Sequence, residues 1–135
     1  MILVLDTSGL KTYIGLWGDG WIAKEEWDAG HSLSSEIIEK MDSLYQKAGI
    51  TLADTKKIVV NTGPGSFTGL RIGLSIANAL AYALNIPIAG IVCPKNYEDL
   101  MEKGIKSLEG RNKFGGAVLP EYGSEPNITK PKKSF

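Results

Sequence analysis

The sequence predicts an α/β fold built on one mixed sheet, with its elements in the order β-β-β-α-β-α-β-α. Three observations predict it. Short apolar runs of strand length stand near the N-terminus, two longer segments repeat apolar residues at helical spacing, and strand-length runs precede and follow the second of these segments. A chain of 135 residues fits one such domain.

The first three strands are predicted at residues 2–5, 11–17 and 21–27. Gly18-Asp19-Gly20 separates the second and third runs, and Asp-Gly between two such runs is a hairpin signal. One face of the third strand is the more polar, as expected near the edge of an antiparallel sheet. The two alternating sets are Trp21, Ala23, Glu25, Trp27 and Ile22, Lys24, Glu26. We therefore expect three antiparallel strands to open the fold.

A helical period replaces the alternation from Ser32 onward and continues to Ala48, where Gly49 predicts the C-terminal end. This pattern predicts an amphipathic helix laid on the sheet. The recurring apolar residues are Leu33, Ile37, Met41, Leu44 and Tyr45.

The chain then continues with a strand at 57–61, a helix at 68–84 and a strand at 86–92, and a weaker helix is predicted at 96–103. From Gly104 onward glycines and prolines recur without a sustained period. We therefore divide the chain into a folded lobe and a tail that is mostly extended or disordered and ends in a basic run. The boundaries are 1–103 and 104–135, and the basic run is Lys130-Pro131-Lys132-Lys133.

Bulk composition excludes several function classes. Lys plus Arg and Asp plus Glu are both 15, so the formal charge is zero and gives no domain-wide attraction to nucleic acid or an anionic membrane. The single Cys93 excludes an internal disulfide, and the N-terminus has no signal-peptide pattern. The apolar segment 70–84 contains Arg71, Ser75 and Asn78 and is too short and polar for a membrane span. We expect a soluble, cytoplasmic protein.

The most informative stretch is Gly63-Pro64-Gly65-Ser66-Phe67-Thr68-Gly69-Leu70-Arg71-Ile72-Gly73, a glycine-rich turn from strand to helix. Ser66 and Thr68 can cap the helix, and the amides of its first turn would point at an anion or a close protein neighbour. The spacing fits neither G-x-x-x-x-G-K-[ST] nor G-x-G-x-x-G. The local pattern thus leaves phosphate contact and a tight packing turn as alternatives.

As a literal string, GPGSFTGLRIG closely resembles the signature of the TsaB (YeaZ) family, bacterial proteins needed to make threonylcarbamoyladenosine in tRNA. The resemblance also holds at residues 2–8, 14–17, 31–32 and 84–90. It implies a ribonuclease-H-like single lobe of the actin, Hsp70 and sugar kinase superfamily.

The sequence departs from the family after residue 103. Typical members continue into a second lobe and end with a segment that resembles residues 120–131, whereas here only a short bridge at 107–117 lies between. The chain is therefore interpreted as a shortened form that lacks most of the second lobe, with 104–135 as its remnant.

The end of the first strand and the glycine-rich loop supply the nucleotide or phosphate candidates. By resemblance, Asp6 would be the metal-side carboxylate, and Thr7 and Ser8 would be hydroxyl donors. The alternative is that these side chains only form local hydrogen bonds to the backbone. Because one open lobe lacks a two-sided clamp, ATP hydrolysis by this chain alone is not expected. The full candidate set is Asp6, Thr7, Ser8, Gly63, Gly65, Ser66 and Thr68.

Neither a metal set nor a nucleophile pair is predicted. His31 is the one histidine, it stands beside the expected helix start, and no H-x-x-x-H spacing exists. Cys93 ends an apolar strand before Pro94, a setting typical of an inert packed thiol. We predict no catalytic residue and no cofactor held by this chain alone, with ATP and Mg²⁺ restricted to a complex.

Small residues repeat every fourth position in the second helix, at Gly69, Gly73, Ala77 and Ala81. Such a ridge lets another helix or a sheet approach closely, either within the chain or from a partner. In TsaB-like proteins the two helices of this lobe form the surface that pairs with the paralogue TsaD, or with a second copy. The resemblance therefore implies an interface that comprises Gly69, Arg71, Gly73, Ala77, Ala81, Ile37 and Met41.

The resulting hypothesis is a non-catalytic scaffold subunit for N6-threonylcarbamoyladenosine (t6A37) formation in tRNA. It would pair with a TsaD-like transferase, have a TsaE-like ATPase as third partner, form a homodimer when alone and meet tRNA only through the complex. The alternatives are a small nucleotide-binding or phosphotransfer protein that uses Asp6 and the loop 63–69, and a relic without a current role.

Overall fold

The computed structural model describes residues 1–28 and 32–121 and confirms the predicted α/β element order. It adds one short 3₁₀ helix after the first helix, which the sequence reading did not predict. The elements are β1 (Ile2–Asp6), β2 (Lys11–Trp17), β3 (Trp21–Asp28), α1 (Leu33–Ala48), η1 (Leu52–Asp54), β4 (Lys57–Gly63), α2 (Phe67–Leu84), β5 (Ile88–Val92) and α3 (Tyr97–Ser107).

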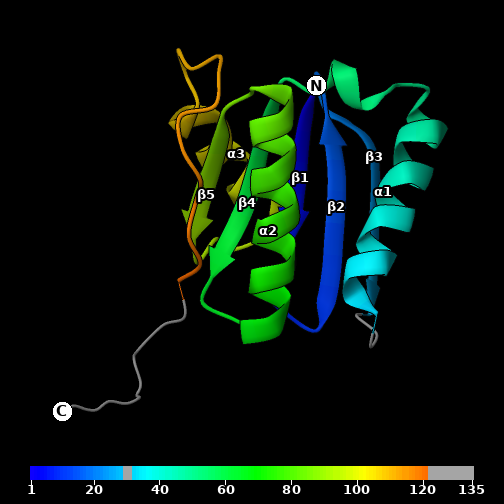
Figure 1. Cartoon of the computed structure of the whole chain (residues 1–135), viewed down its shortest axis with the longest axis vertical. Coiled ribbons are helices and arrows are strands. Elements are labelled where there is room, and N and C mark those ends of the chain that lie inside the picture. Colours follow the sequence, from blue (N-terminus) through cyan, green and yellow to red (C-terminus); the bar gives the residue numbers. More distant parts are fainter. Residues whose placement is uncertain (29–31, 122–135) are drawn as a thin grey trace, which may run out of the picture.

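The five strands form one mixed sheet in the order β3-β2-β1-β4-β5. β1 and β2 pair antiparallel, as do β2 and β3, whereas β1–β4 and β4–β5 are parallel. The parallel pairs need crossovers, and helices form these crossovers over the faces of the sheet. Figure 1 shows α1 and α2 on one side of the sheet and α3 behind it.

Each face of the sheet carries its own core. The core under α1 and α2 contains Leu5, Ile14, Ile37 and Leu70, all at most 1% exposed. The core under α3 is smaller and is built from side chains such as Val4, Val59 and Leu100. Strands buried on both faces explain why β1 and β4 appear in the sequence as continuous apolar runs.

The C-terminal end of α1 and the start of α2 follow the predicted signals, although Thr68, the other predicted cap, lies inside α2. Gly49 closes α1 in the left-handed region with φ 72°, and its N–H donates to the carbonyl oxygens of the last turn. Ser66 precedes α2, and its hydroxyl accepts from the N–H of Gly69 at 3.1 Å. Ser32 precedes α1 without a side-chain capping bond, and the predicted role of His31 lies outside the described residues.

The face assignment of Trp21 is wrong. Trp21 lies with Trp17 in the core under α3, whereas Ala23 and Trp27 pack on the core under α1. The reason is a register shift between Leu16 and Trp17, which puts an extra residue into β3 and moves the start of that strand to the other face.

The packed region also extends past residue 103. α3 runs to Ser107, so the predicted boundary falls inside a helix, and Leu108 beyond it is fully buried. Segment 109–121 forms neither helix nor strand but follows α2 and β5 (Figure 1). It is held there by hydrogen bonds, among them Glu121 N–H to the Thr62 carbonyl oxygen at 2.7 Å. The predicted tail 122–135 lies outside the described residues.

Candidate functional site

The two candidate loops meet at the carboxyl edge of the sheet, where β1 and β4 end side by side. The N–H of Ser66 donates to the carbonyl oxygen of Ser8 at 2.7 Å. The hydroxyl of Thr7 donates to the carbonyl oxygen of Gly69, also at 2.7 Å. The structure therefore brings together the Asp6–Ser8 turn and the loop 63–69, as the sequence reading expected.

Two glycines of the loop are required by this approach of backbone to backbone. A Cβ atom on Gly65 would lie 2.1 Å from the Ser8 carbonyl oxygen, and one on Gly69 would lie 2.4 Å from the Thr7 carbonyl oxygen. No side chain fits at such distances. These glycines therefore serve the packing of the two loops against each other.

The polar side chains of the site bond mainly to one another. One carboxylate oxygen of Asp6 accepts from the Ser8 N–H at 2.9 Å and from the Ser8 hydroxyl at 2.6 Å. The other oxygen accepts from the amide of Asn61 at 3.1 Å. The bond from the Ser8 N–H is the local backbone contact of the second alternative, whereas Thr7 and Asp6 also bond to the distant residues Gly69 and Asn61.

Asn61 is the residue that sequence reasoning missed. Its amide also donates to the Ser8 hydroxyl at 3.0 Å, and its carbonyl oxygen accepts from the Gly63 N–H at 2.8 Å. It is 7% exposed, so a single buried amide links the ends of β1 and β4. The available signal was a polar residue that directly follows the apolar run 58–60.

This arrangement does not fit a nucleotide cradle. The glycines bring backbone against backbone instead of leaving space for a phosphate, and the Thr7 hydroxyl and the Asp6 carboxylate have protein partners. Within residues 1–28 and 32–121, no group of three or more His, Cys, Asp and Glu side chains could hold a metal ion. Nucleotide contact at Gly63, Ser66 and Thr68 stays a prediction.

The interface assignment of the small-residue ridge needs correction. Gly69, Gly73, Ala77 and Ala81 are buried on the side of α2 that faces the sheet. A Cβ atom on Gly73 would lie 2.1 Å from the Thr7 hydroxyl oxygen. The ridge thus lets α2 approach its own sheet, because β1 ends directly beneath it. Ile37 and Met41 likewise belong to the core under α1 and α2.

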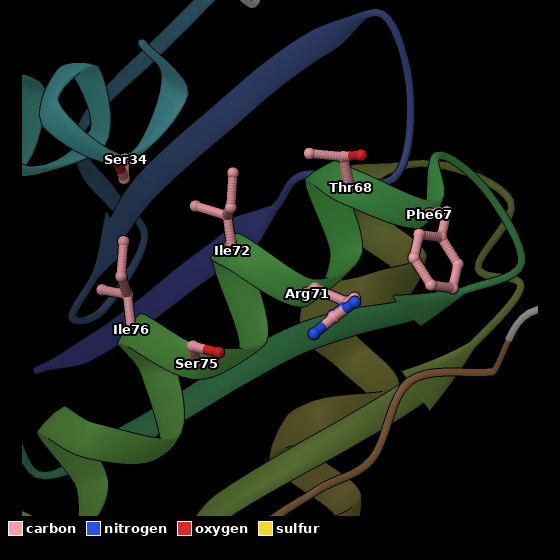
Figure 2. Close-up of a pocket in the computed structure, with 7 residues that line it drawn as sticks. All are labelled: Ser34, Phe67, Thr68, Arg71, Ile72, Ser75 and Ile76. Carbon is pink, nitrogen blue, oxygen red and sulfur yellow. The ribbon is translucent and has the colours of Figure 1, made fainter.

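The outward side of α2 carries a different set of residues. An open cleft of about 400 Å³ lies on this side, and Figure 2 shows Arg71 beside the ring of Phe67 within it. The guanidinium carbon of Arg71 is 5.3 Å from the centre of that ring, a cation–π distance. Among the predicted interface residues, Arg71 is exposed and the other six are buried. The lining residues are Ser34, Phe67, Thr68, Arg71, Ile72, Ser75 and Ile76.

A second, more apolar groove of about 610 Å³ lies between α1 and α2 further along the helices. Ile38, Ile76 and Leu80 contribute aliphatic walls, and the edge of Met41 reaches it. The carboxylates of Glu39 and Asp42 line the same groove. Together with the Arg71 cleft it makes a partly apolar two-helix face, which we call the α1–α2 face.

Cys93 is exposed and is therefore not the packed thiol that was expected. Its N–H donates to the carbonyl oxygen of Gly63 at 2.8 Å, and its φ is 53°. The chain turns here at the end of β5, which directs Cys93 to the surface.

In the described part of the chain, α2 has the length and hydropathy of a membrane-spanning helix, contrary to the expectation for segment 70–84, because the helix begins at Phe67 and reaches 18 residues. Core helices of water-soluble proteins meet the same criteria. The buried ridge of α2, which packs on the sheet, supplies such a core explanation.

Known proteins resemble this chain in sequence and in fold. The family model described as "TsaD: tRNA N6-adenosine threonylcarbamoyltransferase" matches residues 28–93. The chain is 31% identical over 90 residues to the tRNA threonylcarbamoyladenosine biosynthesis protein TsaB of Escherichia coli (strain K12). It is 36% identical over 93 residues to the protein of the same name from Bacillus subtilis (strain 168).

The solved structure of YeaZ from Pseudomonas aeruginosa has a TM-score of 0.63 and 27% sequence identity, over 67% of this chain and 43% of that chain. This likeness confirms the ribonuclease-H-like lobe. The two sequence matches each cover 67% of this chain, but 39% of the Escherichia coli protein and 40% of the Bacillus subtilis protein. The chain therefore belongs to the TsaB (YeaZ) family and spans about two fifths of the length of these relatives.

Proposed function

We propose that this chain is a non-catalytic subunit in the formation of N6-threonylcarbamoyladenosine (t6A37) in tRNA. The relatives that it matches are named as biosynthesis proteins of this modification. The structural observation that carries the proposal is the partly apolar α1–α2 face on a lobe whose polar site residues bond to one another. A subunit of this kind positions an enzyme without supplying an acid, a base or a metal ligand.

The proposed main partner is a TsaD-like transferase that covers the α1–α2 face. Ile38 is 55% exposed and Phe67 is 56% exposed, although both are large apolar side chains. Removing such side chains from water is the usual source of association free energy. Arg71 at one end of the face would pair with a carboxylate of the partner.

The remaining partners form part of the same proposal. A TsaE-like ATPase would be the third component, with ATP and Mg²⁺ used in the complex. A second copy of this chain would cover the α1–α2 face when no transferase is present. Transfer RNA would be modified by the complex in the cytoplasm.

The test is co-purification of this chain with the TsaD-like protein of the same genome, followed by light scattering and a threonylcarbamoyl transfer assay. We expect a defined heterodimer and faster transfer in its presence. A chain that stays alone and leaves transfer unchanged would refute the proposal.

A matched pair of variants locates the interface. Ile38→Glu places a charge on the α1–α2 face, and Ile22→Glu places the same charge on β3, where Ile22 is 48% exposed. We expect Ile38→Glu to weaken binding at least about tenfold, which corresponds to about 1.4 kcal/mol, while Ile22→Glu has little effect. Equal affinities for the two variants would place the interface elsewhere.

A further inference from the structure

A third cleft, of about 390 Å³, opens at the amino edge of the sheet, where β1 and β4 begin. This edge is opposite to the one that holds Asp6, and in Figure 1 it lies near the label N. The volume is within the range of about 300–1,000 Å³ that is usual for small-molecule sites. The lining includes Ile2, Trp17, Asp19, Lys56 and Lys57.

Strand register places an indole and an ammonium group on the same face of the sheet. Ile2 pairs with Trp17 of β2 on one side and with Lys57 of β4 on the other. Paired residues point to the same side, so Trp17, Ile2 and Lys57 form a row across three strands. Strands lie about 4.8 Å apart, so the backbones of Trp17 and Lys57 are separated by roughly 10 Å.

Two cations in this cleft have no acidic partner. The ion pairs in the described part of the chain use Lys11, Lys40 and Lys103. The ammonium group of Lys56 contacts the Ala53 carbonyl oxygen at 3.4 Å, and no contact is found for Lys57 in the described structure. Asp19 is the one carboxylate in the lining, so the cleft offers adjacent positive charge to an anion.

The indole ring of Trp17 is held in place before any ligand arrives. It packs edge-to-face on Trp21, with ring centres 5.1 Å apart and an angle of 84°. The Nε1–H of Trp21 donates to Glu98 at 2.6 Å, which fixes that second ring against α3. An ordered aromatic ring that lines the same cleft as lysine side chains is the combination that binds a base together with its phosphate.

We propose that this cleft binds a phosphate-bearing nucleotide unit, with the phosphate at Lys56 and Lys57 and the base against Trp17. The proposal is independent of the α1–α2 face and of any partner protein. The unit is either a free nucleotide or one residue of a single-stranded RNA. Both sources supply the same anion and aromatic base, so the experiment distinguishes them.

The test is fluorescence anisotropy of an end-labelled single-stranded RNA titrated with the full chain, with unlabelled AMP as competitor. AMP binding is also measured directly by calorimetry. RNA binding that AMP does not displace identifies a strand site, and AMP binding identifies a nucleotide site. Absence of both overturns the proposal.

Two variants with equal change of charge provide the control. Lys57→Glu should weaken binding about tenfold, or about 1.4 kcal/mol. Lys95→Glu, at the opposite edge of the sheet, should leave binding within twofold of the unchanged chain. Equal losses in both variants would show a non-specific charge effect and overturn the site.

Two further measurements distinguish this site from general attraction of anions. Trp17→Leu should weaken nucleotide binding but not the binding of inorganic phosphate, and circular dichroism checks that the variant is folded. The RNA affinity of the unchanged chain should fall as salt rises, with a slope that reflects about one neutralised phosphate. Binding that is indifferent to Trp17→Leu, or to salt, would contradict the proposal.

Discussion

The side-chain amide of Asn78 hydrogen-bonds both backbone groups of Val118. It donates to the Val118 carbonyl oxygen at 2.9 Å and accepts from the Val118 N–H at 2.9 Å. Asn85 holds the N–H of Phe114 in a similar way at 3.2 Å. The amides of Asn78 in α2 and of Asn85 directly after it thus take the place that a neighbouring strand would have, and they hold segment 109–121 without any regular element.

Asn78→Ala is expected to lower the free energy of unfolding by about 1–2 kcal/mol, because two hydrogen bonds are lost. Hydrogen exchange at the Val118 amide should become faster, while exchange in β1 follows only the global change. Asn112→Ala, an exposed position in the same segment, is the control and should have little effect. A Val118 amide that is equally protected in both variants would contradict the proposed role of Asn78.

Gly73→Ala tests the direction in which the small-residue ridge points. The added methyl would meet Thr7 at 2.1 Å, which outweighs the gain of about 1 kcal/mol in helix propensity. We expect a net loss of about 1–2 kcal/mol in chemical denaturation, as is usual for overpacking. Ser75→Ala, on the exposed side of the same helix, should be neutral or stabilising. A Gly73→Ala variant as stable as Ser75→Ala would show that the ridge does not face the sheet.

Asn61→Ala removes the amide that links β1 to β4. The Gly63 N–H would lose its acceptor in a buried position, and Asp6 would lose one donor. We expect thermal denaturation to show a loss of about 2–3 kcal/mol, the cost of leaving such groups unpaired. Asn96→Ala removes the helix cap of α3 and serves as the comparison. We expect it to lower stability by about 1 kcal/mol.

The hydrogen bonds of Asp6 predict that ATP gives the isolated chain no stabilisation that depends on Mg²⁺ or on Asp6. A ligand at a hundredfold excess over its Kd adds about 2.7 kcal/mol to stability, so even moderate affinity is detectable. A rise in Tm that depends on Mg²⁺ and is lost in Asp6→Asn would instead establish the nucleotide site. AMP without Mg²⁺ serves as the comparison, because the cleft at Lys57 needs no metal ion.

Tyr13→Phe is expected to raise stability at neutral pH by about 1 kcal/mol. The Tyr13 hydroxyl is buried and has no hydrogen-bond partner among the described residues, which is costly. The phenyl ring keeps the stacking of Tyr13 on Tyr97, whose centres are 3.7 Å apart. Tyr82→Phe, at a residue that is 73% exposed, is the matched control and should be neutral.

Tyr13→Phe should also change how the stability of the fold depends on pH in the alkaline range. Burial raises the pKa of the Tyr13 hydroxyl far above its ordinary value of 10.0, and the nearby carboxylates of Glu98 and Glu26 add to the effect. The folded chain therefore holds this proton more tightly than the unfolded chain. Stability is full below the ordinary pKa and falls as the pH rises above it toward the raised value. Denaturation above pH 10 should show a smaller loss for Tyr13→Phe than for Tyr82→Phe, and equal slopes would contradict this origin.

Local sequence signals determined the helices and strands of this protein. The period of α1, the stop at Gly49 and the cap at Ser66 depend on neighbours within a few residues, so the chain alone specifies them. The literal string from Gly63 to Gly73 likewise carried the resemblance to the family.

Tertiary structure decided which surface each element presents. The repeat that includes Gly73 and Ala77 predicted the small-residue ridge of α2. A helical period does not say whether such a ridge packs on a sheet or on a partner. The Thr7 side chain beneath Gly73 supplies the answer. Asn61 likewise became a linking residue only because β1 and β4 pair. Such relations join residues distant in the chain, and close packing of whole elements is what determines them.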